Sequence, residues 1–318
     1  MGKNELSQIK EITSDLAVKL KRRGITTIKA LSLMAVTDLK ELGVEEELAR
    51  RILREAWARC GFGFITADQL EKVRKKQFLT TGCKALDAIL GGGVQTGEIT
   101  ELIGAYGSGK TQTQFTILTV NLGENPDIGA IFLDSEDTFS NKRIREIAKA
   151  RGYDADSILK RTIVVTAPAS EQFMISVDEM PRMINEKNIK LIFLDSLIAP
   201  FRSEYVGREI LWYRQQLINK LLRKLLNYAT VFNLAIVVSN QVVARPEAVY
   251  TTDIIAQNPP AGGHIVAHGC ATRVYFRKAG ESKRIARIID SSWLPEAECV
   301  FKITEKGIED IEEKTSKS

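Results

Sequence analysis

The feature that most constrains this sequence is the stretch GAYGSGKT, residues 104–111, which follows the apolar run EITELI. It matches the pattern G-x-x-x-x-G-K-[ST] in full, a pattern that is meaningful when a strand precedes it and a helix follows. Its glycines let backbone N–H groups turn inward around phosphate oxygens. The stretch therefore predicts a nucleotide site in which Lys110 reaches the β and γ phosphates and the hydroxyl of Thr111 ligates Mg²⁺.

Four apolar runs, EITELI, GAIFLD, KLIFLD and LAIVVSNQ, alternate with stretches of helical pattern. Each run stops at polar or glycine residues, as buried strands do. This alternation is typical of an α/β fold whose mainly parallel central sheet is covered by helices on both faces. Ligands of such sheets collect at the carboxyl ends of the strands, where these polar residues fall.

The residue pattern divides the chain into three segments. Residues 1–60 place apolar residues at helical spacing between breaks at Gly24 and Gly43, which predicts a small all-helical domain with helix-turn-helix units. Residues 61–78 begin with two glycines and carry a basic cluster, so we interpret them as an interdomain linker. Residues 79–318 contain the four apolar runs and form the predicted nucleotide-binding core.

Composition adds broad limits. In 318 residues, no apolar run reaches the roughly 18 to 20 residues that span a bilayer, and the amino terminus does not resemble a secretion signal. We expect a soluble cytoplasmic protein with no membrane partner. The net charge of +5 permits nucleic-acid binding without arguing for it. The four cysteines lack metal-binding spacing and are expected to be reduced and mostly buried.

Polar residues at the ends of the apolar runs are candidates for nucleotide chemistry. Asp195 ends KLIFLD, where a carboxylate can hold Mg²⁺ through water, although a helix cap is the structural alternative. Glu136 lies just past GAIFLD and can polarise the water that attacks the γ phosphate. Asp134 and Asp137 are competitors for that role, and an ordinary polar strand end is the alternative. Gln241 follows AIVVSN and is placed to sense the γ phosphate.

Two stretches are predicted to be loops. RSEYVGREILWYRQQ holds three arginines around a glycine, and ARPEAVYTTDIIAQNPPAGGH has three prolines and a Gly-Gly pair. Long irregular loops in compact domains are usually functional. Arginines and backbone amides on such loops suit the phosphates of a single strand, whereas the alternative is a surface insertion.

With these residues in place, the chain resembles the archaeal RadA recombinases, relatives of eukaryotic Rad51-type and bacterial RecA proteins. The matching stretches include LTTGCKALDAILGGGVQTGEITEL, GSGKTQ, LIFLDS, FRSEY, SNQVVARP, GGHIVAH, KRIARIIDS and LPEAECVFKITEKGIED. The resemblance implies a RecA-like ATPase core behind a small helical domain. It also implies ATP and Mg²⁺ as cofactors and a filament on single-stranded DNA that exchanges strands with a homologous duplex.

The resemblance implies roles for individual residues. Glu136, Lys110 and Gln241 are the expected catalytic set. The expected nucleotide contacts are Gly104, Ala105, Tyr106, Gly107, Ser108, Gly109, Lys110, Thr111, Gln112, Arg143 and Asp195, with Arg143 stacked on adenine. The expected DNA contacts are Arg208, Arg214, Arg245, Gly262 and Gly263.

The resemblance also implies contacts between subunits. Phe64 and Ala67 match a linker motif that docks into the adjacent subunit, the alternative being an ordinary entry to a linker helix. His268, rather than His264, matches the histidine that approaches the neighbour's phosphates, although a hydrogen-bonded structural role is the alternative for either. Asp290 and Pro295 belong to a cap over the neighbour's nucleotide.

The chain departs from the family pattern at four places. Glu11, Ile12 and Thr13 replace a Gly-x-Gly hairpin, so DNA contact there is not expected. The other departures are Ser140 and Asn141 in place of Arg-Pro, Ser291 to Trp293 in the cap, and Glu209, Trp212 and Tyr213 in the first DNA loop.

The expected function is that of a DNA-dependent ATPase that acts as a recombinase, cytoplasmic and nucleoid-associated. It would assemble as a helical filament or ring and work with mediators or paralogues. A divergent paralogue that binds ATP and DNA as an accessory factor is the first alternative. A signalling or clock-type ATPase of the same fold is the second.

Overall fold

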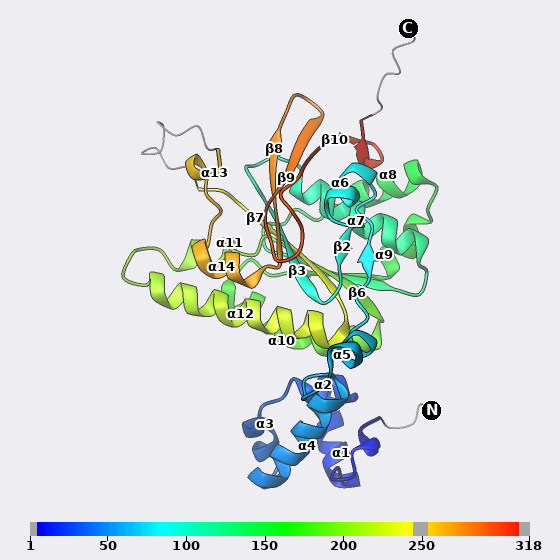
Figure 1. Cartoon of the computed structure of the whole chain (residues 1–318), viewed down its shortest axis with the longest axis vertical. Helices are drawn as coiled ribbons and strands as arrows, with labels where there is room; N and C mark the ends of the chain where they lie inside the picture. Colours follow the sequence, from blue (N-terminus) through cyan, green and yellow to red (C-terminus); the bar gives the residue numbers. More distant parts are fainter. Residues whose placement is uncertain (1–4, 244–253, 312–318) are drawn as a thin grey trace.

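The computed structural model describes residues 5–243 and 254–311 (Figure 1). Its centre is a nine-stranded sheet in the order β11-β10-β9-β8-β3-β7-β6-β4-β5. The six strands from β8 to β5 run parallel, and β9 to β11 add an antiparallel extension. The strands are β3 (Glu98–Gly104), β4 (Gly129–Asp134), β5 (Thr162–Thr166), β6 (Ile189–Asp195), β7 (Ala235–Asn240), β8 (Thr272–Lys278), β9 (Lys283–Ser291), β10 (Glu298–Thr304) and β11 (Gly307–Asp310).

The four apolar runs form β3, β4, β6 and β7, the adjacent central strands, so the predicted mainly parallel α/β fold is confirmed. All four are buried along their whole length apart from one half-buried lysine in β6, which explains why they read as continuous apolar runs. The strands beyond them were not predicted. In β9, for example, buried and exposed residues alternate, so no continuous apolar run marks it.

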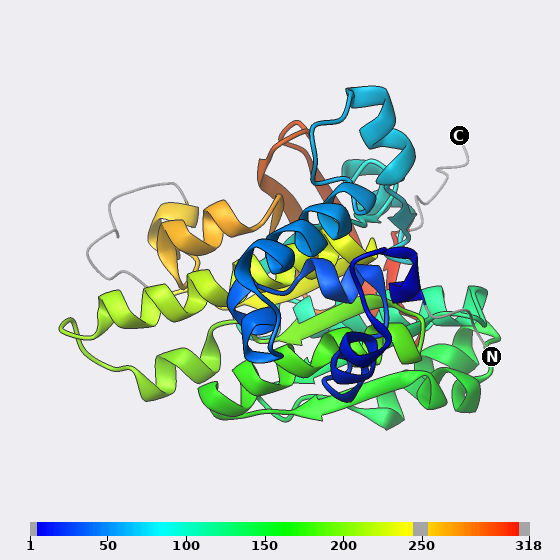
Figure 2. The ribbon, with the colours of Figure 1, turned by 90° about the horizontal axis from the view of Figure 1, so that it is seen from below.

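Helices cover both faces of the sheet (Figures 1 and 2). Alternate residues of each strand point to opposite faces, so Ile131 and Leu133 of β4 join one core cluster while Ala130 and Phe132 join the other. The first face carries α10 (Ser170–Glu186), α11 (Ala199–Glu204), α12 (Leu211–Phe232) and α14 (Gly263–Gly269). The second carries α6 (Lys84–Ile89), α7 (Lys110–Glu124), α8 (Asn141–Arg151) and α9 (Ala155–Lys160).

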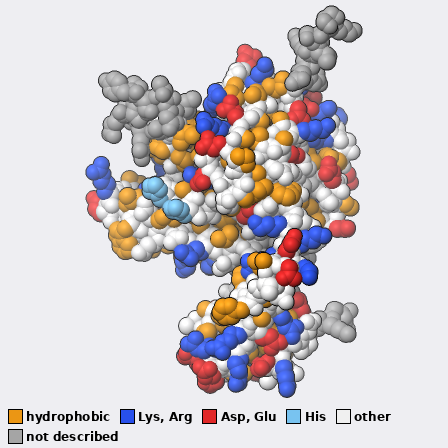
Figure 3. Space-filling model, in the orientation of Figure 1, with side chains coloured by type: hydrophobic (Ala, Val, Ile, Leu, Met, Phe, Trp, Pro, Cys, Tyr) orange, Lys and Arg blue, Asp and Glu red, His pale blue; other side chains and the backbone are white. Residues whose placement is uncertain are grey.

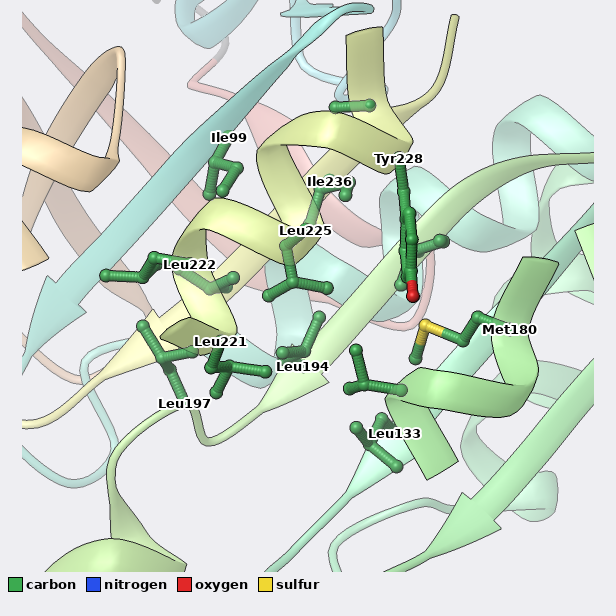
Figure 4. Close-up of a cluster of buried hydrophobic side chains, with 14 of the residues drawn as sticks. Ile99, Leu133, Met180, Leu194, Leu197, Leu221, Leu222, Leu225, Tyr228 and Ile236 are labelled. Atoms are coloured by element: carbon green, nitrogen blue, oxygen red, sulfur yellow. The ribbon is translucent and has the colours of Figure 1, made fainter. Parts of the chain in front are cut away.

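The core beneath α12 fixes this helix along the sheet. Figure 4 shows Leu221, Leu222 and Leu225 of α12 packed against Leu194 and the side chains around it. All three leucines are buried. The first predicted loop, residues 202–216, is a loop only in its middle, because residues 202–204 belong to α11 and residues 211–216 to α12. The packing of α12 holds this stretch at a defined place on the carboxyl side of the sheet.

The amino-terminal helices form a separate cluster with its own core, below the sheet in Figure 1. They are η1 (Glu5–Gln8), α1 (Ser14–Arg22), α2 (Ile28–Ser32), α3 (Val36–Glu41) and α4 (Glu46–Arg59). Gly24 and Gly43 end α1 and α3 in the left-handed conformation that glycine tolerates, with φ of 78° and 86°. In the segment that replaces the family's Gly-x-Gly hairpin, the hydroxyl of Thr13 accepts a hydrogen bond from Leu16 N and caps α1.

The segment between the two parts contains α5 (Ala67–Val73) and β1 (Phe78–Leu79), which pairs with β2 (Val94–Gln95). The remaining helix is the short α13 (Ile254–Gln257). Three of the four cysteines are buried and all four are free thiols. Among the described residues, none of the helices is both long and apolar enough to cross a bilayer.

Candidate nucleotide site

The glycine-rich loop turns at the carboxyl end of β3 and leads directly into α7, which begins at Lys110. Gly107 and Gly109 have φ of 72° and 107°, a region that favours glycine. At Gly104, a β-carbon would lie 2.5 Å from both the Phe276 carbonyl oxygen and Ser108 Oγ. Glycine is therefore required for the loop to fold this closely around its own backbone, as the sequence pattern predicted.

Lys110 is largely buried within this loop. Its Nζ donates to the carbonyl oxygens of Gly104 and Ala105 at 2.8 and 3.1 Å. Burial lowers the pKa of Lys110, and the carboxylates of Asp195 and Glu136 oppose that shift. The ammonium is thus held by neutral carbonyls of the loop, with the two carboxylates nearby.

Asp195 occupies the carboxyl end of β6, next to the loop. Its Oδ2 accepts from Thr111 Oγ1 at 2.6 Å and from Thr138 Oγ1 at 3.2 Å, while its Oδ1 accepts from the buried Ser239. A carboxylate and a hydroxyl at this separation are hard oxygen donors suited to Mg²⁺, which usually keeps several waters. The residues present therefore fit the implied metal.

Glu136 and its two competitors occupy different environments. Asp134 is buried and its carboxylate accepts from the backbone N–H groups of Glu136 and Phe139, so it stabilises the turn after β4. Asp137 is exposed in the left-handed region, with φ of 56°. Glu136 alone of the three lines the cleft. Its Oε1 accepts from Ser196 Oγ at 2.8 Å.

Gln241 lies at the end of β7 and contacts the same carboxylate. Its Nε2 donates to Glu136 Oε1 at 3.0 Å, and its backbone oxygen accepts from Ala261 N at 2.9 Å. Val242 forms an isolated bridge with Pro260, which holds together the two ends of the second predicted DNA loop. One residue thus joins the predicted catalytic carboxylate to the base of that loop.

These groups surround a cleft of about 850 Å³, which is within the range of ligand pockets. Arg143 of α8 reaches it with its Nε donating to Gln112 Oε1 at 2.8 Å and its guanidinium bonded to the Thr304 carbonyl. The cleft is lined by Tyr106, Gly107, Gly109, Lys110, Thr111, Gln112, Glu136, Thr138, Arg143, Asp195, Ser196, Ser239, Gln241, Glu281, Ser282, Arg284 and Ile303.

Several lining residues were not predicted from the sequence. Arg284 comes from β9, far along the chain from the glycine-rich loop, yet its Nε donates to the Gly107 carbonyl at 3.2 Å. No linear pattern marks it, because only the pairing of β9 with β8 brings it to the loop. Ser196 and Ser239 lie directly beside predicted positions, and their place at strand ends is the signal that could have indicated them. The others are Thr138, Glu281, Ser282 and Ile303.

A second hollow of about 320 Å³ adjoins the cleft. Ser196 and Gln241 line both spaces, so they form a shared wall. The far side of this hollow includes Arg202 of α11 and Ala261. Arg202 lies at the start of the first predicted DNA loop, and Ala261 lies near the end of the second. The phosphate end of the cleft is therefore only one layer of side chains away from both loops.

The remaining predicted residues lie outside the cleft. Arg208 is exposed in the loop between α11 and α12, and Arg214 Nη1 donates to the Tyr205 carbonyl at 3.0 Å. Gly262 and Gly263 open α14 with φ of 86° and 62°, and His268 is exposed on the same helix. Phe64 is fully exposed, Ala67 begins α5, Asp290 lies in β9, and Pro295 follows that strand. Arg245 lies outside the described residues.

A family model described as Rad51 matches residues 73–311, about three quarters of the chain. This range contains the sheet, the glycine-rich loop, both predicted DNA loops and every residue that lines the cleft. Proteins of this family are in general DNA-dependent ATPases of recombination and repair that bind ATP with Mg²⁺ and form oligomeric filaments on DNA. On this match and on the fold, the chain belongs to the Rad51 family.

Proposed function

We propose that this protein is an ATP-dependent DNA recombinase of the archaeal RadA type. In this proposal it forms a filament on single-stranded DNA and catalyses homologous pairing and strand exchange during recombinational repair. The observation that carries the proposal is the position of Gln241, which contacts Glu136 in the cleft and Ala261 beside the second loop. A change at the γ phosphate would therefore be transmitted to a DNA-binding segment.

The side chains of the cleft have different roles in hydrolysis. Glu136 orients the attacking water and accepts its proton, since its carboxylate is the one that faces the cleft. Lys110 neutralises charge on the outer phosphates, and the backbone N–H groups of the glycine-rich loop surround their oxygens. Mg²⁺, held by Thr111 and through water by Asp195, would further offset the charge on the phosphates.

Coupling to DNA follows from competition for the amide of Gln241. The amide donates to Glu136 Oε1 at 3.0 Å. A γ phosphate is a more highly charged acceptor and would draw the amide away, which frees the carboxylate for water and shifts the backbone bonded to Ala261. Nucleotide state would thereby set the conformation of both loops, a switch of the order-to-disorder kind.

Assembly of subunits is part of the proposal. Phe64 is a fully exposed aromatic side chain on the segment before α5, and such a side chain is suited to serve as an interface anchor. His268, Asp290 and Pro295 would then face the neighbouring subunit's nucleotide. Each subunit of the filament would consist of the helical domain at residues 1–60, the linker at 61–78 and the core at 79–318. We place this filament at the nucleoid.

A specific observation favours the paralogue as the second candidate. Trp293, in the proposed nucleotide cap, packs against Phe78 of its own chain with ring centroids 5.8 Å apart. It also covers Gly91, where a β-carbon would approach its ring to 2.8 Å. A cap that packs against its own subunit would contact a neighbour's nucleotide differently. An accessory protein would tolerate this difference better than a recombinase.

One experiment separates the candidates. ATP hydrolysis is measured with and without single-stranded DNA, followed by strand exchange between a single strand and a homologous duplex. Stimulated hydrolysis with strand exchange supports the recombinase. DNA binding without exchange supports the accessory paralogue, and hydrolysis at a rate indifferent to DNA supports a signalling or clock-type ATPase.

A further inference from the structure

Exposed apolar side chains gather in the loop between α11 and α12 and in the first turn of α12. Val206, Ile210, Leu211, Trp212 and Tyr213 are 72%, 36%, 37%, 60% and 41% exposed. Figure 3 shows hydrophobic and basic side chains together at the outer end of α12, where this loop turns. Such a concentration of exposed apolar residues marks an interaction site. The question is what covers it.

The rings of Tyr205, Tyr213 and Trp212 contact one another in series at this patch, and we call these three rings the ladder. The rings of Tyr205 and Tyr213 are 5.4 Å apart at 67°, and those of Tyr213 and Trp212 are 5.8 Å apart at 71°. These are favourable edge-to-face arrangements. The inner end is anchored at its backbone, because Arg214 Nη1 donates to the Tyr205 carbonyl at 3.0 Å. The outer ring, Trp212, is therefore held in place while most of its surface stays open.

The charges beside the ladder indicate an anionic occupant. Arg202 at the end of α11 and Arg208 in the loop are exposed, and Arg214 lies one residue after Tyr213. Of the two acidic residues in this stretch, Glu204 accepts from Ser170 N at 2.8 Å, whereas Glu209 is exposed beside Arg208, so the cations remain in excess. A flat aromatic surface between cations matches a polymer that alternates planar rings and phosphates. A single nucleic-acid strand has that chemistry.

We propose that Trp212 and Tyr213 form a base-stacking platform for unpaired nucleotides in the first turn of α12, where the first predicted DNA loop enters the helix. This inference rests on the proposed function and adds to it a contact with bases, where the arginines contact phosphates. A base stacks on the open face of Trp212, with Tyr213 supporting the ring from behind. Because every base has a π face, the platform holds a strand of any sequence.

The test compares binding of oligothymidylate and of an abasic oligodeoxynucleotide of equal length, with a non-hydrolysable ATP analogue present. Both probes carry the same phosphates, but only the first carries bases. Trp212→Ala should weaken binding of oligothymidylate about 5- to 100-fold and leave binding of the abasic strand unchanged. Trp212→Phe should keep most of the affinity. Leu211→Ala is the matched control, since it removes exposed apolar surface from the same turn without removing a ring.

Fluorescence supplies an independent readout. The chain has three tryptophans, so Trp57→Phe with Trp293→Phe leaves Trp212 as the single reporter. Oligothymidylate should quench its emission, and the abasic strand should not. Unquenched emission on bound oligothymidylate overturns the platform.

The remaining outcomes are equally decisive. Equal loss of both probes by Trp212→Ala overturns the platform, because the rings would then only position the arginines. Unchanged binding of oligothymidylate overturns it too, and a fall in self-association would assign the patch to a second copy. If the unsubstituted chain binds neither probe at low salt, the proposed function fails together with the platform. Failure of the platform alone leaves oligothymidylate binding by the unsubstituted chain intact.

Discussion

The nucleotide cleft and the loop at the start of α12 differ in where their functional groups find partners. In the cleft, Lys110, Asp195 and Glu136 are bonded to groups of their own chain. In the loop, the side chains of Arg208 and Trp212 extend into solvent. The same contrast separates the cleft from the linker, where Phe64 is fully exposed. The cleft is largely assembled before its ligand arrives, whereas the loop and linker depend on other molecules.

This difference has a physical reason. Buried charges require partners, because leaving them unpaired away from water is costly. Lys110 and Asp195 are buried, so their charges need partners within the chain. Exposed arginines keep their hydration and carry no such requirement. Substitutions in the cleft should therefore affect both chemistry and stability, while those in the loop should affect binding alone.

The largest effect is expected from Lys110→Ala, which removes the cation of the cleft. Loss of a group that stabilises developing charge costs about 10²- to 10³-fold in turnover, so ATP hydrolysis should fall by at least about 10²-fold. The measurement is steady-state phosphate release. Lys142→Ala, an exposed lysine of α8, is the control and should hydrolyse ATP normally. Normal turnover by Lys110→Ala would refute the nucleotide site.

The next effect tests the linker. Phe64→Glu should disperse filaments into smaller species, because a charge replaces the apolar anchor at the proposed interface. Size-exclusion chromatography with light scattering measures the mass, and circular dichroism checks that the core remains folded. Ile175→Glu, which alters a residue that is also apolar and more than half exposed, is the matched control and should leave assembly intact. An unchanged mass for Phe64→Glu would remove Phe64 from the interface.

Gln241→Ala tests the junction between the two regions. It removes the amide that donates to Glu136 but leaves Lys110, Thr111 and Asp195 in place. Stimulation by single-stranded DNA should be lost even where hydrolysis without DNA remains, since coupling between two such sites is typically about 1 to 3 kcal/mol, or about 5- to 150-fold. The same rate assay with increasing DNA measures both. Full stimulation would mean that the signal bypasses this residue.

Ser239→Ala tests whether cleft residues contribute to stability. Ser239 is fully buried and donates to Asp195 Oδ1, so its loss leaves a buried carboxylate oxygen short of a donor. The free energy of unfolding of the core should fall by about 1 to 3 kcal/mol. Ser176→Ala, at a half-buried serine of α10 whose hydroxyl donates to the Gln172 carbonyl of its own helix, should change it by less than about 0.5 kcal/mol. Urea denaturation followed by circular dichroism gives both values, and equal values would contradict the contrast.

How far the sequence predicts this molecule follows the same division. The central strands were predictable because strands that are buried on both faces have continuous apolar sequences, as in β6. The glycine-rich loop was predictable because its backbone demands glycine at Gly104, Gly107 and Gly109. Arg284 was not, because its place depends on the pairing of β9 with β8. The bonds of Asp134 to the turn after β4 were not predictable either, since nothing in the sequence marks them.

The smallest effect is expected from Glu209→Gln in the loop. Glu209 is exposed beside Arg208 and would repel the phosphates that this arginine is proposed to bind. Removing its charge should tighten binding of single-stranded DNA by about two- to fivefold at low salt, and the gain should vanish as added salt screens the exposed charge. Asp127 precedes β4 and lies at the amino ends of the parallel strands, away from the loop. Asp127→Asn removes one charge there and should change the affinity for DNA less. Fluorescence anisotropy across a salt series distinguishes the two. A gain of equal size from both variants would mean that only net charge matters, and that the position of Glu209 beside Arg208 has no part in DNA binding.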